Sequence, residues 1–201
     1  MTLPDEALQA DWEKRIDGTW ADLWANLWPN WRRVLTGTDS DTPPPAEPVL
    51  RLCRVTTDYE WMGTFEPLRW LPAVTDALLW DENGMDLGPL TGVAHEQGRS
   101  WDRLQLAGNA AVDLSELSGT PVRQLILSNV DVRDIASLAD IPGLTSLTLD
   151  LDGCRGNGAT LPPLPDLTDL VLHPGTDVRV EPGPRVRRVD DAYRPPYDEN
   201  G

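Results

Sequence analysis

A pattern of apolar positions recurs along the middle of the chain, in the form apolar-x-x-apolar-x-Leu. The five copies are Val74-Ala77-Leu79, Trp101-Leu104-Leu106, Val122-Leu125-Leu127, Leu144-Leu147-Leu149 and Leu167-Leu170-Leu172, and their last leucines are 27, 21, 22 and 23 residues apart. The alternation at the end of each copy is typical of a strand with its leucines on one face. Because one such strand cannot bury its leucines alone, the repeat predicts parallel strands stacked over a continuous core.

A second block of residues follows three of these copies at a constant distance. It reads Asp86-Leu87-x-x-Leu90, Asp113-Leu114-x-x-Leu117 and Asp134-Ile135-x-x-Leu138. We interpret the apolar positions of the block as the second wall of the core. The aspartate is expected to form a turn or a helix cap, because its carboxylate can accept backbone N–H groups. These aspartates need no catalytic role to explain them.

With these two motifs the chain resembles the leucine-rich-repeat family, in its short bacterial internalin-like form of about 22 residues. The resemblance covers residues 71–172. It implies an α/β leucine-rich-repeat solenoid with a parallel sheet on its concave face. In that family the concave face is the usual binding surface.

The repeat becomes weaker at both ends and departs from the family in one respect. An additional turn is expected at Leu50 and Leu52, which lie 27 residues before Ala77 and Leu79, and another at Val186 and Val189. Only Asn109 stands where the family usually places its ladder asparagine.

Tryptophan dominates the segment before the repeats. Trp12, Ile16, Trp20, Trp24 and Trp28 recur every four residues, with Leu8, Leu23, Leu27, Trp31 and Leu35 nearby. This spacing predicts an amphipathic helix, which Gly18 and Pro29 should divide. The helical segment could cap the first repeat or could dock on a partner.

Three regions follow from these patterns. Residues 1–48 form the tryptophan-rich helical cap with a proline-rich connector, residues 49–192 form the repeats, and residues 193–201 form a tail. The connector contains three consecutive prolines, which favour an extended spacer.

Charge narrows the choice of partner. The chain has 33 acidic and 17 basic residues, a net charge of −16. This balance argues against binding to nucleic acid or to anionic membranes, and it permits a basic protein partner. The N-terminus lacks the features of a secretory signal, and no apolar run reaches the roughly 18 residues of a membrane span. We therefore expect a cytoplasmic protein. The thiols of Cys53 and Cys154 are expected to be unpaired, with a long-range disulfide as the alternative.

Candidate catalytic chemistry is sparse. His95 and His173 are the only histidines, and neither belongs to a zinc motif. The chain has no phosphate-binding Gly-Lys-Ser/Thr sequence, so we expect no cofactor and no metal. A Ser/His/Asp triad is not excluded by spacing. We expect a protein that is not an enzyme, and keep a hydrolase using acidic concave residues as a remote alternative.

The alternation within each strand predicts which side chains face away from the core. The candidate partner-binding residues are Asp76, Leu78, Trp80, Arg103, Gln105, Gln124, Ile126, Ser146, Thr148, Asp150, Asp169, Val171 and His173. Four of them are apolar and should be exposed, and three are aspartates that should form an acidic rim around them. Trp80 is the best anchor candidate, since tryptophan is enriched at interface hot spots.

The predicted function is non-enzymatic protein–protein interaction through this concave face. Two more specific forms stay open. The chain could be an immunity protein that masks a cognate toxin, or a scaffold or sensor subunit of a bacterial defence complex. In either form the acidic surface would speed association with a basic partner.

Overall fold

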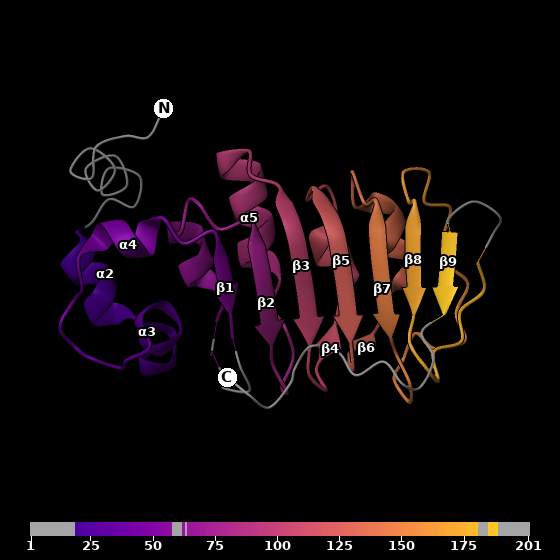
Figure 1. Ribbon diagram of the computed structural model, residues 1–201, viewed down its shortest axis with the longest axis horizontal. Coiled ribbons are helices and arrows are strands. Elements are labelled where there is room, and N and C mark those ends of the chain that lie inside the picture. The colour runs from indigo at the N-terminus through magenta and orange to yellow at the C-terminus, as the bar shows by residue number, and fades with distance from the viewer. Residues whose placement is uncertain (1–18, 58–61, 63, 181–184, 189–201) are drawn as a thin grey trace.

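The computed structural model describes residues 19–57, 62, 64–180 and 185–188. Its centre is a parallel sheet of seven strands that follow one another in sequence order (Figure 1). The strands are β1 (Arg54–Thr56), β2 (Asp76–Trp80), β3 (Trp101–Ala107), β5 (Val122–Ser128), β7 (Ser146–Asp150), β8 (Asp169–Leu172) and β9 (Arg185–Arg188). This arrangement confirms the predicted α/β class and the parallel sheet.

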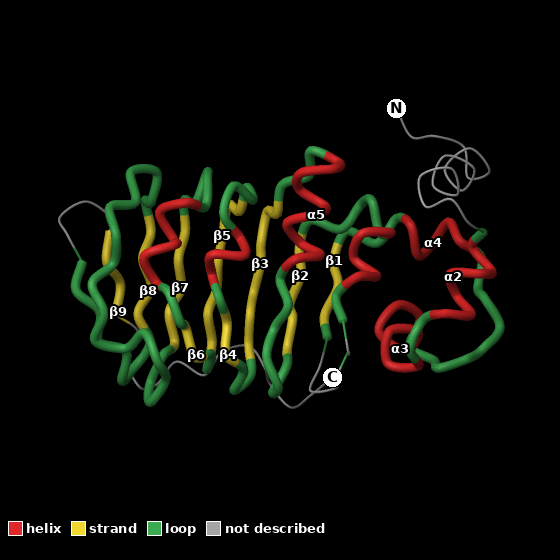
Figure 2. Tube along the Cα trace, turned by 180° about the vertical axis from the view of Figure 1, so that it is seen from behind, coloured by secondary structure: helices red, strands yellow, loops and turns green. Residues whose placement is uncertain are grey.

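In the described parts of the chain, the segments that connect neighbouring strands lie on one side of the sheet. The returning segments contain the 3₁₀ helix η1 (Glu66–Trp70), the helix α5 (Gly88–Gln97) and the 3₁₀ helices η2 (Leu114–Leu117) and η3 (Ile135–Asp140). A small second sheet on this side pairs β4 (Ala111–Val112) with β6 (Asp131–Val132). Figure 2, drawn from behind, has these segments in front of the strands.

The five predicted copies align in register and supply the core. Their central apolar residues pair from strand to strand in the order Ala77, Leu104, Leu125, Leu147 and Leu170, and all five are fully buried. The aspartates of the second block act as expected. Asp86, Asp113 and Asp134 each accept the backbone N–H two residues ahead, at 3.0, 3.0 and 3.1 Å.

The expected turns at the two ends of the repeat are wrong in position. Leu50 is the last residue of helix α4 (Ala46–Leu50), and the first strand is β1, in which Val55 pairs with Ala77. The step from Val55 to Ala77 is therefore 22 residues. The 27-residue spacing belongs to the repeat that contains α5, since that helix has ten residues where η2 has four.

At the other end of the sheet a strand is present but its predicted register is wrong. Val186 of β9 lies beside Leu170, the second apolar position of its copy. The pattern had placed it beside Leu167, the first position. Val189 lies outside the described residues.

Asn109 does not occupy a ladder position. Its side chain is exposed. It is the one residue by which the turn before β4 is longer than the corresponding turn before β6. Ala110 takes the inward position instead, and its carbonyl accepts the N–H of Asp131 at 2.9 Å. The turn is tight, because Gly108 has φ +109° and a Cβ there would lie 2.1 Å from the carbonyl oxygen of Asp81.

The tryptophan segment forms two short helices beside β1, α2 (Trp20–Asn26) and α3 (Pro29–Thr36) (Figure 1). Pro29 is the first residue of α3, which confirms the predicted break there. Leu8, Trp12, Ile16 and the second predicted break, Gly18, lie outside the described residues.

Trp20, Trp24 and Trp31 are buried in the same apolar cluster as the leucines of the strands. Their indole N–H groups donate to the carbonyls of Pro44 at 2.6 Å, Ser40 at 3.0 Å and Thr64 at 2.7 Å. Two of these three acceptors belong to the proline-rich connector. The connector is therefore bonded to the helices that it follows, and it does not act as a free spacer between them and the repeats.

Two further observations concern the whole described chain. Cys53 and Cys154 are free thiols, as expected. Among the helices in the described ranges, none has the length and apolar character needed to cross a membrane.

Candidate binding face

The sheet has one face that the helices leave uncovered, which we call the front face (Figure 1). Side chains from neighbouring strands lie on it in three rows. The first row is Arg54, Asp76, Arg103, Gln124, Ser146, Asp169 and Arg185; the second is Thr56, Leu78, Gln105, Ile126, Thr148, Val171 and Arg187; the third is Trp80, Ala107, Ser128 and Asp150. Every predicted site residue except His173 belongs to these rows. His173 directly follows β8, and its N–H donates to the carbonyl of Leu149 at 2.9 Å.

Two of the predicted outward residues are not exposed. Leu78 is only 8% exposed and Gln105 only 4%, so the expectation that both face solvent is wrong. In the second row Leu78 lies between Thr56 and Gln105, and the amide of Gln105 accepts a hydrogen bond from Arg103 at 3.2 Å.

Three large apolar side chains of the front face are partly accessible. Trp80, Ile126 and Val171 are each half-buried, and each lies on a strand held on both sides by its neighbours. The backbone of such a strand is already ordered, so a partner that covers these side chains does not have to order it. These three residues are therefore suited to making apolar contacts at low entropic cost.

The charges on the front face are balanced, which differs from the predicted acidic rim. The first and second rows contain four arginines, and the three rows together contain three aspartates. Asp76 pairs with Arg54 at 3.6 Å. The charge of −16 is therefore located mainly outside this face.

The arginines that the first and last strands place on the front face were not predicted from the sequence. Arg54, Arg185 and Arg187 lie on the front face because of the registers of β1 and β9, and both registers had been placed wrongly. The signal that could have found Arg54 is the 22-residue step, applied backwards from Ala77.

Ser128, Asp150 and His173 meet at the edge of the front face. The hydroxyl of Ser128 donates to Oδ2 of Asp150 at 3.3 Å, and Nδ1 of His173 lies 4.0 Å from the same oxygen. A nucleophilic triad needs the histidine between the serine and the aspartate, so that the imidazole removes the hydroxyl proton. Here the aspartate is central, and the arrangement is a polar cluster in which the serine is not activated.

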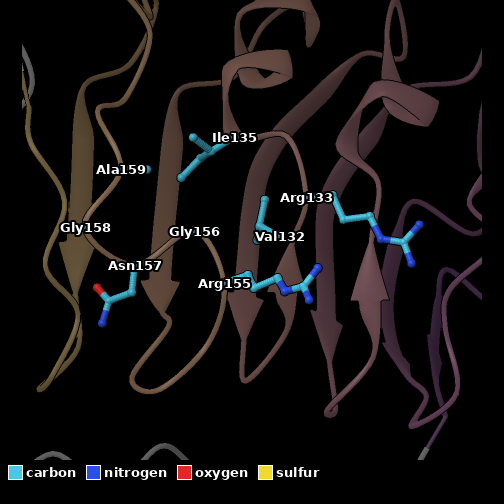
Figure 3. A pocket seen from close by; sticks show the side chains of 8 residues that line it. All are labelled: Val132, Arg133, Ile135, Arg155, Gly156, Asn157, Gly158 and Ala159. Atoms are coloured by element: carbon cyan, nitrogen blue, oxygen red, sulfur yellow. The ribbon is translucent and has the colours of Figure 1, made fainter.

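A hollow of about 470 Å³ lies on the opposite side of the sheet. It is lined by Val132, Arg133, Ile135, Arg155, Gly156, Asn157, Gly158 and Ala159. In Figure 3 the side chains of Arg133 and Arg155 extend in the same direction, away from the wall formed by residues 156–159. The backbone N–H of Arg155 donates to the carboxylate of Asp131 at 2.8 Å.

No family model, curated protein or solved structure matches this chain. The geometry of the molecule therefore has to carry any functional argument. Within the described part of the chain, no three His, Cys, Asp or Glu side chains are grouped to hold a metal ion.

Arg99 and Cys154 have shifted pKa values, and both lie away from the front face. Burial lowers the pKa of Arg99 to about 10. Its guanidinium donates to the carbonyls of Leu68 at 3.2 Å and Val74 at 3.4 Å, and it lies 5.9 Å from the centre of the Trp101 ring. Arg99 is therefore a structural link between consecutive turns of the chain.

Burial also raises the pKa of the Cys154 thiol, and nearby carboxylates add to the effect. This thiol is therefore not an activated nucleophile.

Proposed function

We propose that this chain is a non-enzymatic protein-binding module, and that the front face of its sheet contacts the partner. The observation that carries the proposal is the uncovered face itself, with Trp80, Ile126 and Val171 half-buried among polar side chains. An apolar centre within a polar surround is the usual anatomy of a protein interface. Trp80 is the proposed anchor.

We further propose that the architecture is a short solenoid of the leucine-rich-repeat type. Strands that add in sequence order, each returning behind the sheet, support this interpretation. The burial of Trp20, Trp24 and Trp31 with the leucines supports a capping role for α2 and α3 in preference to a docking role.

The size of the face sets a requirement on the partner. Seven strands at about 4.8 Å spacing span about 29 Å, and the three rows extend about 13 Å along the strands. This is a planar area of about 380 Å², whereas a standard interface covers about 800 Å² on each side. We therefore propose that the partner also contacts loops at the strand ends. The nearby Ser128, Asp150 and His173 cluster lies at one such end.

The test compares what the chain captures from its native host. The front-face variant combines Trp80→Asp with Ile126→Arg, and the matched control combines Arg133→Ala with Arg155→Ala on the opposite side of the sheet. Thermal unfolding of all three proteins establishes that each is folded. We expect a stoichiometric partner with the wild type and the control, and its loss with the front-face variant.

Equal recovery by all three folded proteins would refute the front face as the interface. Recovery of no partner by the wild type would reopen the hydrolase alternative, which a turnover lost in Asp150→Asn would support. The identity of a captured partner separates the two forms of the proposal, since a toxin indicates an inhibitor and a multiprotein assembly indicates a scaffold.

A further inference from the structure

The two edges of the sheet differ in how they are covered. At the β1 edge, α3 contacts the strand, and Trp31, Val49 and Leu50 are buried there. At the other edge all four residues of β9 are exposed, and Val186 is 46% exposed. An exposed edge strand carries backbone N–H and C=O groups that can pair with another strand.

The direction of these backbone groups follows from the pairing of β9 with β8. The N–H of Arg185 donates to the carbonyl of Thr168 at 2.9 Å, toward the sheet. Since successive residues of a strand direct their hydrogen-bonding groups to opposite sides, the N–H groups of Val186 and Arg188 point to the open side.

The exposed strand is strongly cationic in a chain of net charge −16. Three of its four residues are arginines, and no ion pair joins Arg185, Arg187 or Arg188 to a carboxylate in the part of the chain that the structure describes. Pairing of two copies through this edge would place arginines of both copies side by side, and like charges on adjacent strands repel. The edge is therefore complementary to an acidic strand and not to itself.

We propose that the open edge of β9 binds an extended acidic segment of a partner protein by strand addition. The added strand would place carboxylates beside Arg185 and Arg187 on the front side of the sheet. It would place an apolar side chain beside Val186 on the other side. Arg187 lies beside Val171, but Trp80 and Ile126 lie on β2 and β5, away from this edge, so strand addition at β9 does not require those two residues.

The probe is a fluorescein-labelled twelve-residue peptide of alternating Glu and Val, with an alternating Lys and Val peptide as control. Fluorescence anisotropy at low salt measures binding to the full chain. We expect the Glu peptide to bind and the Lys peptide not to bind. Raising the salt should weaken binding, because the ion pairs are exposed to solvent.

Two variants separate strand addition from simple charge attraction. Arg185→Glu with Arg187→Glu reverses the charge, and Val186→Pro keeps every charge but removes the outward N–H. We expect each to weaken binding at least about tenfold. Hydrogen exchange provides an independent readout, because bound peptide should slow exchange of the Val186 and Arg188 amides.

The variant with Trp80→Asp and Ile126→Arg should bind the Glu peptide as the wild type does. Failure of the front-face proposal is therefore distinguishable from failure of the strand-addition proposal. Full binding by a folded Val186→Pro variant would overturn strand addition and leave charge attraction alone. Absence of binding to the wild type would overturn the proposal, as would a dimer that the same Val186→Pro substitution dissociates.

Discussion

Two adjacent residues of β5 provide a sharp test of the strand register. Leu125 is fully buried among the core leucines, whereas Ile126 faces the front side and is half-buried. Leu125→Ala removes a buried side chain and should lower the free energy of unfolding by about 2–5 kcal/mol. Ile126→Thr replaces a half-buried side chain by threonine, the residue at the neighbouring position 148 of the same row. It should lower the free energy of unfolding by less than about 1 kcal/mol.

Urea unfolding followed by circular dichroism measures both values. With a slope of about 2 kcal/mol per molar urea, Leu125→Ala should lower the midpoint by about 1–2.5 M and Ile126→Thr by less than about 0.5 M. Equal losses, or a larger loss for Ile126→Thr, would mean that the register is shifted by one residue and that the front face is part of the core.

Three further perturbations test other parts of the fold. Trp31→Ala should cost about 3–5 kcal/mol in urea unfolding, because Trp31 is fully buried where α3 meets the sheet; a near-neutral result would mean that α3 does not stabilise this end. The Ser115 hydroxyl and N–H lower the pKa of Asp113, so the stability that Asp113 contributes is lost as the pH falls below about 4 through that lowered pKa. Asp113→Asn should therefore flatten the acid fall of the melting temperature, and an unchanged pH profile would refute this. Gly108→Ala should lower the melting temperature markedly, whereas unchanged melting would contradict the close approach of Asp81.

The strands that the sequence predicted are those in which two independent signals agree. In β3 and β5 the alternating leucines define the buried face, and Asp113 and Asp134 then mark the turns that follow. Local turn chemistry and core burial require the same register there, so the pattern could be read directly.

The remainder depends on contacts between segments that are distant in sequence. Leu50 has the same apolar signal whether it lies in a strand or, as it does, at the end of a helix packed under the tryptophans. The burial of Leu78 depends on its cross-strand neighbours, which no single-strand pattern specifies. The exposure of Leu78 and Gln105 and the arginines from β1 and β9 could not be predicted, because both depend on how strands distant in sequence pair.

Site-specific photo-cross-linking is the sharpest test of partner binding on the front face. A photoreactive phenylalanine analogue replaces Ile126 or Val171 on the front face, or Arg133 or Arg155 on the opposite side, and each protein is irradiated in the native host. We predict a partner adduct from positions 126 and 171 and none from positions 133 and 155. Adducts from positions 133 and 155 alone would contradict it.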